Sequence, residues 1–448
     1  MIFINTLSVI NDFLHDLVGG PLMITAIIAT GLYLTWRVGF LQVRKFGTVL
    51  RETLFSIFKP AKGAKGDISP FQALTTALAA TIGTGNIAGV ATAISLGGPG
   101  AIFWMWVSAF LGMITKYSEV VLAVHYRRTR GKMVVGGPMY YLEHGLNSRL
   151  LAVLFALFGA LAAFGIGNMV QANSVADAVN QAFNIPPLIT GLVLAAATAV
   201  VIIGGIRRVA SITDKLVPLM AAFYFFGALT ILLLAAPLIP SAFASIIGNA
   251  FTGRAAVGGF AGAGVMQAIR FGIARGIFTN EAGLGSASIA HAAARTDHPA
   301  RQGLWGIFEV FFDTHVICTM TALVILVTGV WSQGLEGAGM TTAAFNQGLP
   351  GPGGYIVATG LVFFSFSTLV AWSFYGEKCF EYLAGSRSVM LYRLVWIPLI
   401  PIGAIGGLRT VWALADTLNG LMAIPNLIGL WGLSGVVIKL TREFFSKN

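Results

Sequence analysis

Long apolar stretches, separated by short polar or Gly- and Pro-rich turns, run through almost the whole of this chain. A helix needs roughly 17 to 25 residues to cross the hydrocarbon of a bilayer. Eleven stretches fit that length or exceed it, at residues 20–40, 68–95, 101–125, 149–183, 188–206, 215–239, 262–292, 303–330, 354–379, 389–407 and 412–438. The pattern predicts an all-α polytopic membrane protein with eleven transmembrane helices.

Two of the eleven spans are interrupted near their centres by glycine and polar residues. The interruptions are Thr81-Ile-Gly-Thr-Gly-Asn86 and Phe278-Thr-Asn-Glu-Ala-Gly-Leu-Gly285. Inside lipid every backbone N–H and C=O needs a partner, so a helix unwinds there only where protein or a polar cavity takes up the freed groups. Paired interruptions in corresponding spans are typical of the substrate site of a secondary transporter.

The two interrupted spans also divide the chain. With the first span set aside, the remaining ten form two groups of five, each beginning with an interrupted helix, and the two groups enter the membrane from opposite sides. This predicts a five-plus-five inverted repeat, with an N-terminal helix and loop at 1–66 and repeats at 67–240 and 241–448. The halves share no residue-level identity beyond the Gly-rich interruptions, so the predicted symmetry rests on hydropathy and orientation.

Composition agrees with a chain that lies mostly in lipid, because 56% of its residues are hydrophobic, 10% are charged and its mean hydropathy is +0.81. The net charge of +11 could suggest nucleic acid as a partner. However, all but five of the 28 Lys and Arg residues lie on alternate loops. That asymmetry marks the cytoplasmic side. It predicts an external N-terminus and a cytoplasmic C-terminus in the cell's inner (plasma) membrane, and no nucleic-acid partner.

Other sequence signals exclude several classes of protein. The first twenty residues lack a basic start and lead into a full-length span, so we expect that span to be retained rather than cleaved as a signal. The two cysteines, Cys318 and Cys379, imply no disulfide framework and are expected to serve packing. The histidines show no metal-binding spacing, and no span carries a paired nucleophile and base, so no enzyme activity is expected.

Four motifs carry a resemblance to a known family. They are Ala80-Thr-Ile-Gly-Thr-Gly-Asn-Ile-Ala-Gly89, Gly136-Gly-Pro-Met-Tyr140, Gly276-Ile-Phe-Thr-Asn-Glu-Ala-Gly-Leu-Gly-Ser286 and Phe374-Tyr-Gly-Glu377. Together they closely resemble the alanine or glycine:cation symporters, also called sodium:alanine symporters, over essentially the whole chain. The resemblance implies a leucine-transporter-like inverted repeat with one additional N-terminal helix. It also implies uptake of small neutral amino acids coupled to Na⁺, with no other cofactor and no obligate protein partner.

The first interruption fits that function on physical grounds. Gly83 and Gly85 permit an unwound backbone, and the outer half-helix then presents unpaired amides near Thr84 and Gly85 to a carboxylate. Asn86 is counted with this substrate site, and the carbonyls of Ala79 and Ile82 are candidate sodium ligands. A dinucleotide fingerprint is formally present, but it needs a preceding strand. Close helix packing by glycine is the other alternative, and it leaves Thr84 and Asn86 unexplained.

At the second interruption the resemblance implies that the carbonyls of Phe278 and Thr279 receive the substrate amine and that the Phe278 ring closes over it. Gly283 is included in the same site. Glu281 is the ionisable residue of this segment, and such a group inside lipid is a functional candidate. We favour an ion pair with Arg270 or Arg275 for Glu281 over a role as proton acceptor, because sodium coupling removes the need for a proton relay.

Two further spans supply candidate ligands. Ser367 and Thr368 offer adjacent hydroxyls one turn after the Phe364 carbonyl, and the superfamily resemblance implies that they complete the sodium site, although such hydroxyls alone often bond their own helix. Trp372 either lines the substrate pocket or anchors packing. Gln171 resembles the family position that contacts the substrate amine, and Asp177 lies nearer the exterior, in a vestibule or in solvent.

Several functional alternatives stay open at this point. The coupling ion could be a proton instead of sodium, and the substrate could be a larger neutral amino acid such as glutamine. A channel would need a continuous polar pore, and interrupted helices in opposed halves fit alternating access better.

Overall fold

The computed structural model describes residues 20–56, 65–131, 133–252, 261–406 and 409–446. The N-terminal part contains α2 (Pro21–Arg37), α3 (Leu41–Arg44), α4 (Phe46–Thr53), η1 (Leu54–Ser56), α5 (Pro70–Thr81), η2 (Gly85–Gly89), α6 (Val90–Gly97), α7 (Ala101–His125), β1 (Arg128–Arg130), β2 (Met133–Val135) and α8 (Pro138–His144). The middle part contains α9 (Arg149–Ala162), η3 (Ala163–Met169), α10 (Val170–Phe183), α11 (Pro187–Ile202), α12 (Gly205–Leu234), η4 (Ala236–Leu238) and α13 (Ile239–Thr252).

The C-terminal part contains α14 (Ala261–Asn280), α15 (Ser288–Ala292), α16 (Pro299–Val310), η5 (Phe311–Cys318), α17 (Thr319–Val327), η6 (Val330–Ser332), α18 (Gly337–Gly348), α19 (Gly353–Ala384), η7 (Ser386–Ser388), α20 (Val389–Ile405), α21 (Arg409–Gly432) and α22 (Ser434–Ser446). Within the described residues, six helices are long and apolar enough to cross a membrane, or eight if each of two bent pairs counts as one span. The chain is therefore a helical, multi-pass membrane protein.

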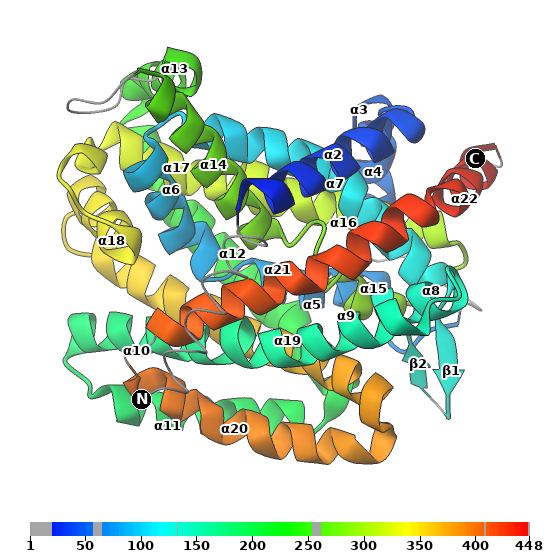
Figure 1. Cartoon of the computed structure of the whole chain (residues 1–448). Helices are drawn as coiled ribbons and strands as arrows, with labels where there is room; N and C mark the ends of the chain where they lie inside the picture. Colours follow the sequence, from blue (N-terminus) through cyan, green and yellow to red (C-terminus); the bar gives the residue numbers. More distant parts are fainter. Residues whose placement is uncertain (1–19, 57–64, 132, 253–260, 407–408, 447–448) are drawn as a thin grey trace, which may run out of the picture.

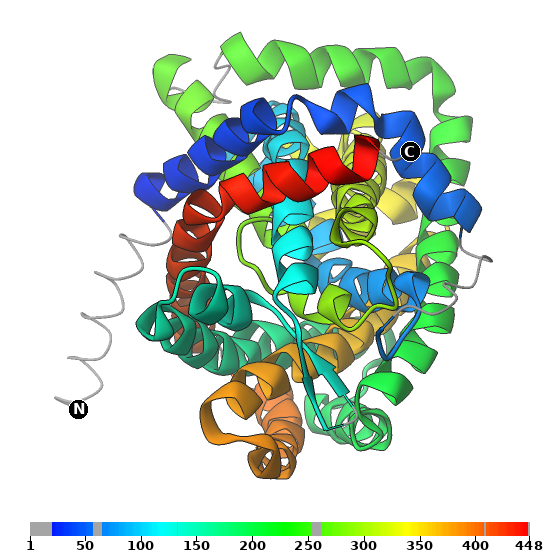
Figure 2. The ribbon, with the colours of Figure 1, turned by 90° about the vertical axis from the view of Figure 1, so that its right-hand side faces the viewer.

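The helices surround α7, which Figure 2 shows in cyan near the middle of the bundle. α7 packs against α14 and α16, and α19 packs against α5, α9, α10 and α12. At the lower side of Figure 1, α10, α11 and α20 pack against one another as an outer group. The β1 and β2 strands form a short antiparallel hairpin that pairs Arg128 with Val135 at one end of the molecule.

The first predicted interruption is confirmed. Ser69 and Gln72 form a reciprocal cap at the start of α5, the helix ends at Thr81, and η2 and α6 resume after a bend of 53°. The predicted span at 101–125 coincides with α7. The helices α13 and α18 were not expected, because they lie between the spans and have no full-length apolar run.

The second interruption begins later than the sequence suggested. α14 continues through Phe278 to Asn280, and the non-helical segment occupies 281–287. The backbone turns there through positive φ values at Glu281 (55°), Gly283 (99°) and Gly285 (79°). α14 continues to Asn280 because the first residue with a positive φ is Glu281, and the helix ends there. Gly283 and Gly285 adopt positive φ values without steric cost.

The last predicted span, 412–438, is not one straight helix. α21 ends at Gly432 and α22 begins at Ser434, with a bend of 59°. At Gly432 a Cβ would lie 2.6 Å from the Leu146 side chain, so glycine allows the close approach at which the chain turns. Beyond the bend α22 is amphipathic and buries Val437, Leu440 and Phe444 against its neighbours.

In the part of the chain that the structure describes, three of the long spans contain a π-helical turn, at η2, η3 and η5. Such turns carry an extra residue per turn and frequently occur at functional sites. The apolar pattern of the sequence did not reveal them, because one added residue leaves the hydrophobic run unbroken.

Candidate functional site

The first interruption is held open by side chains. The amide of Gly83 donates to Asn86 Oδ1 at 2.9 Å, and Asn86 Nδ2 donates to Asp313 Oδ1 at 2.7 Å. Both Asn86 and Asp313 are fully buried. Asn86 thus satisfies a freed backbone amide and ties the interruption to η5. Sequence reasoning did not consider Asp313, although a carboxylate within an apolar span was the available signal.

Four of the five predicted sodium ligands, Ala79, Phe364, Ser367 and Thr368, meet between α5 and α19. The hydroxyls of Ser367 and Thr368 donate to the Ala79 carbonyl at 3.3 and 3.0 Å, and to the Phe364 carbonyl at 2.8 and 2.9 Å. Ile82 is also buried here, and the next residue, Gly83, lies so near that a Cβ would be 2.9 Å from Thr368 Oγ1. Two hydroxyls and two carbonyls form a group of hard oxygen donors that suits a monovalent cation.

A small polar cavity of about 20 Å³ lies between the two interruptions. Its lining includes Gly83, Thr84, Gly85, Gln171, Phe278, Glu281, Thr368 and Trp372. Thr84 Oγ1 and Gln171 Oε1 are buried without a hydrogen-bond partner. Buried polar atoms are nearly always paired, so these two oxygens are available to a polar ligand or to water in the cavity.

Three predicted substrate residues do not line this cavity. Asn86 uses both polar atoms in the contacts described above. The Gly283 amide donates to Glu119 Oε1 at 2.9 Å, and a Cβ on Gly283 would meet Ile27. Thr279 packs closely against Gly85, and its hydroxyl donates to the Arg275 carbonyl at 2.7 Å. These residues shape the interruptions around the cavity.

The carbonyls of Phe278 and Thr279 lack their usual helical partners. In a continuing helix they would accept from Ala282 and Gly283, but those amides donate to Asn280 Oδ1 at 3.0 Å and to Glu119 Oε1. Phe278 and Thr279 lie in the last turn of α14 rather than in an unwound segment. The correction leaves their carbonyls as orphaned acceptors at a helix C-terminus, where the dipole favours a cation.

The preferred ion pair of Glu281 with Arg270 or Arg275 is wrong. Glu281 lies beyond the end of α14, and its carboxylate instead accepts from Trp372 Nε1 at 2.9 Å and from Ser286 Oγ at 2.6 Å. Arg270 and Arg275 lie over the rings of Phe271 and Phe278, at 5.7 Å from each centroid. The positive φ at Glu281 turns its side chain inward, which helical spacing alone could not reveal.

Trp372 lines the cavity and is also tightly packed. A Cβ on Gly167 in η3 would lie 2.2 Å from the Trp372 Cβ, so only glycine fits behind the indole. In front, the indole N–H is held by Glu281. Trp372 is therefore both a wall of the small cavity and a packed side chain, and the ring has little freedom to move.

A second, much larger cavity of about 810 Å³ opens on the other side of Phe278 and Thr84. Its walls include Asn173, Asp177, Arg275 and Glu336. Thr84 and Phe278 line both cavities. Of the two positions left open for Asp177, a vestibule or solvent, the structure places it in the wall of this large cavity, and Phe278 lies between that cavity and the small one.

The opposite end of the bundle is closed by backbone contacts around Arg127. Its guanidinium donates to the carbonyls of Ala292 (3.2 Å), Ala294 (2.7 Å), Lys65 (2.9 Å) and Thr296 (3.5 Å). In addition, Ile68 and Ala294 form a parallel bridge. The segments that precede α5 and follow α15 are thereby fastened together. The large cavity therefore lies on one side of the small cavity, and the contacts of Arg127 close the other side.

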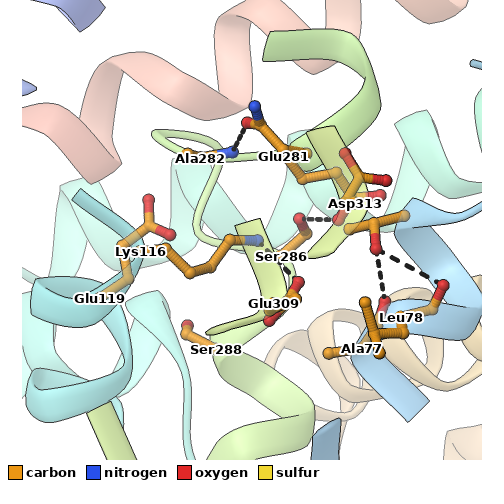
Figure 3. Close-up of polar contacts among 12 residues, drawn as sticks. Ala77, Leu78, Lys116, Glu119, Glu281, Ala282, Ser286, Ser288, Glu309 and Asp313 are labelled. Carbon is orange, nitrogen blue, oxygen red and sulfur yellow. Dashed lines mark hydrogen bonds and ion pairs between the residues drawn. The ribbon is translucent and has the colours of Figure 1, made fainter. Parts of the chain in front are cut away.

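A buried ionic cluster supports the second interruption from α7 and α16. Lys116 Nζ lies 3.2 Å from Glu309 Oε1, and His291 Nε2 lies 2.9 Å from Glu309 Oε2. Figure 3 shows Lys116 reaching toward Glu309, with Glu281 and Ser286 nearby. Sequence reasoning placed Lys116 inside a span but assigned it no partner. The partners are 193 residues apart.

Glu119 is a second missed carboxylate, and it holds the backbone of the second interruption. Its Oε1 accepts from the amides of Gly283 (2.9 Å) and Gly285 (3.1 Å) and from Asn426 Nδ2 (2.7 Å). Tyr141 of α8 donates to the Asn426 side chain in turn. The Gly136-Gly-Pro-Met-Tyr140 motif therefore packs beside this interruption, where a Cβ on Gly285 would clash with Pro138.

Membrane helices with two interruptions that meet at one polar cavity define a secondary transporter, and comparison with solved structures agrees. MhsT, solved in complex with L-phenylalanine, matches with a TM-score of 0.59 at 14% identity, covering 85% of this chain and 99% of that one. A manganese transporter from Eremococcus coleocola matches with a TM-score of 0.51 at 12% identity, covering 85% and 82%. At these identities the likeness shows the fold alone, which is that of the leucine-transporter type.

Sequence comparison gives the family. The sequence profile of the sodium:alanine symporter family matches residues 4–448, and the chain belongs to that family. The sodium/alanine symporter AgcS of Methanococcus maripaludis is 52% identical over 454 residues, covering 99% of this chain and 98% of AgcS. A probable sodium/glutamine symporter, GlnT of Bacillus subtilis, is 39% identical over 435 residues, covering 96% and 89%. The chain is thus a transporter rather than an enzyme.

Proposed function

We propose that this protein takes up alanine or glycine together with Na⁺ by alternating access. The observation that carries the proposal is the small cavity between two interrupted helices, with orphaned oxygens on Thr84 and Gln171 and with the Ser367 and Thr368 hydroxyls adjoining it. The 52% identity to AgcS, described as a sodium/alanine symporter, supports the same assignment.

The substrate carboxylate is assigned to the first interruption. η2 continues directly into α6, so Gly85 and its neighbours form the N-terminus of a helix that runs to Gly97. Its first amides have no helical partner, and the dipole there favours an anion. The Phe278 carbonyl, at the C-terminus of α14, is then assigned to the substrate amine on the other side of the cavity, with the Thr279 carbonyl next to it in the chain.

Sodium is assigned to the oxygens of Ala79, Ile82, Phe364, Ser367 and Thr368. A bound cation would accept lone pairs from both hydroxyls, which at present donate to the carbonyls of Ala79 and Phe364. Because Thr368 lines the substrate cavity as well, a cation there would sit beside the amino acid. That arrangement provides a direct route for coupling.

The volume of the cavity favours a small substrate. A space of about 20 Å³ holds little more than one water, and the packing of Trp372 against Gly167 limits its expansion. Alanine or glycine needs the smallest rearrangement. Glutamine, the substrate in the name of the relative GlnT, would need Phe278 or Trp372 to move further.

For the architecture we propose eleven crossings, with an N-terminal helix and loop at 1–66 followed by inverted repeats at 67–240 and 241–448. The position of the two interruptions in α5–α6 and α14–α15 supports the repeat. We assign the Arg127 end to the cytoplasm and the large cavity to the exterior, in agreement with the loop charges. The structure then represents an outward-facing state in the plasma membrane.

Uptake into liposomes tests the proposed function. Purified protein reconstituted with an inward Na⁺ gradient is expected to accumulate radiolabelled alanine, and the same vesicles with an inward proton gradient and no Na⁺ are not. Protein-free vesicles serve as the control. Equal alanine uptake with and without the sodium gradient would reject sodium coupling.

Replacement of Gln171 by Ala is expected to weaken alanine binding about tenfold. The change removes the orphaned Oε1 from the cavity and with it one hydrogen bond to a charged group, worth about 1.5 kcal/mol. Isothermal titration of alanine in saturating NaCl measures the effect. Asn180→Ala is the matched control, because Asn180 lies on the same helix and donates to Ile185 at the surface. Equal affinities in the two variants would remove Gln171 from the site.

A further inference from the structure

Glu281 is the one ionisable side chain among the described residues that line the small cavity. Glu281 is 3% exposed to solvent. One carboxylate oxygen accepts from Trp372 and the other accepts from Ser286. Both donors are neutral, so they orient the carboxylate without compensating its charge.

The buried cation Lys116 forms its ion pair with Glu309 and not with Glu281. Lys116 lies at 3.2 Å from Glu309, and both side chains are fully buried. Among the described residues no ion pair includes Glu281, and Figure 3 shows the Lys116 ammonium directed at Glu309. An uncompensated buried carboxylate costs several kcal/mol. An ammonium group that entered the cavity would therefore be the first cation in direct contact with Glu281.

The backbone at Glu281 is also strained. Its φ of 55° lies in the left-handed region, which costs a residue with a side chain roughly 1 to 2 kcal/mol. Asn or Gly would adopt this conformation more easily. Strain of this kind is found where a site fixes a particular side chain. Here the left-handed conformation brings the carboxylate inward, beside Trp372.

We propose that the Glu281 carboxylate binds the ammonium group of the substrate and thereby selects zwitterionic amino acids over acids that lack the amino group. This inference rests on the proposed function, and it adds a charged partner to the Gln171 oxygen and the α14 carbonyls. The substrate carboxylate lies at the helix N-terminus of the first interruption, and its ammonium lies at the second. Each free lone pair on Glu281 can accept one N–H.

The test compares two ligands that differ only at the group in question. Alanine and lactate share the carboxylate and the methyl group, but lactate has a hydroxyl in place of the ammonium. Binding of each is measured by competition against radiolabelled alanine, with purified protein in saturating NaCl. In the wild type, alanine is expected to bind at least a hundredfold more tightly than lactate.

Glu281→Gln keeps the size of the side chain and a carbonyl acceptor for Trp372, but it removes the charge. Alanine affinity is expected to fall ten- to hundredfold while lactate affinity stays the same or rises, so the ratio between them collapses. Glu143→Gln makes the same change at a residue that accepts from Tyr382 away from the cavity, and it is expected to preserve the ratio.

Several results would overturn the inference. An unchanged ratio in Glu281→Gln, or equal weakening of alanine and lactate, would show that Glu281 only supports the fold. A higher half-saturating Na⁺ concentration at an unchanged ratio would make Glu281 part of the cation site. If Glu281→Gln cannot be purified, Glu281→Asp serves as the second variant. Its side chain is one methylene shorter, so the carboxylate lies farther from the ammonium, and the ratio of alanine to lactate affinity is expected to fall. A wild type that fails to bind alanine with Na⁺ would reject the proposed function itself.

Discussion

Replacing Thr368 with Ala is expected to raise the half-saturating Na⁺ concentration for alanine uptake by roughly ten- to a hundredfold. The hydroxyl lies 3.0 Å from the Ala79 carbonyl and 2.9 Å from the Phe364 carbonyl. Loss of one oxygen that contacts a charged group costs about 1.5 to 3 kcal/mol, and each 1.4 kcal/mol corresponds to a factor of ten. Initial uptake rates in liposomes over a range of Na⁺ concentrations measure the shift.

Two variants frame this result. Thr368→Ser retains the hydroxyl and is expected to keep most of the sodium affinity. Thr230→Ala removes an exposed hydroxyl that donates to the Phe226 carbonyl of its own helix, and it is expected to change nothing. An unaltered sodium dependence in Thr368→Ala would place the cation elsewhere in the molecule.

The second large effect concerns stability. Lys116→Met is expected to lower the free energy of unfolding by about 3 to 5 kcal/mol, because Glu309 would remain buried without the Lys116 ammonium and with only His291 beside it. Both side chains are 0% exposed at a separation of 3.2 Å. Unfolding in mixed micelles, followed as a function of the mole fraction of sodium dodecyl sulfate, gives the change.

A double-mutant cycle separates the pair from other losses at Lys116. Adding Glu309→Gln to Lys116→Met removes the stranded charge and is expected to restore part of the stability. Lys439→Met, at a lysine with 76% side-chain exposure and a 4.0 Å contact to Glu443, is expected to cost less than about 1 kcal/mol. If Lys116→Met lowered the free energy of unfolding no more than Lys439→Met does, the buried pair would have no structural role.

The first interruption could be predicted from the sequence because its cause is local. Gly83, Gly85 and the polar residues around them occur together in an apolar run, and lipid penalises that combination wherever it falls. The sequence and the family resemblance together also predicted that Ser367 and Thr368 belong to one site with the first interruption. The hydroxyls are adjacent, their spacing from Phe364 is helical, and the family resemblance indicated the partner helix.

The second interruption was harder to predict because its causes are remote. Its amides are held by Glu119, which lies 164 and 166 residues earlier in the chain. Glu281 was paired with the nearest arginines, as proximity in sequence suggested. The left-handed backbone at Glu281 instead directs the carboxylate to Trp372, 91 residues away. Neither relation leaves a periodic signal in the hydropathy pattern.

The fastening at Arg127 has a consequence for how the protein changes state. The Arg127 guanidinium donates to main-chain oxygens of both segments at the closed end. These hydrogen bonds depend on the backbone path of the two segments and not on their side chains. Side-chain substitutions in the two segments can therefore leave the hydrogen bonds of Arg127 intact. When the two segments part, the bonds on at least one side are lost together, and the release is expected to be abrupt rather than gradual.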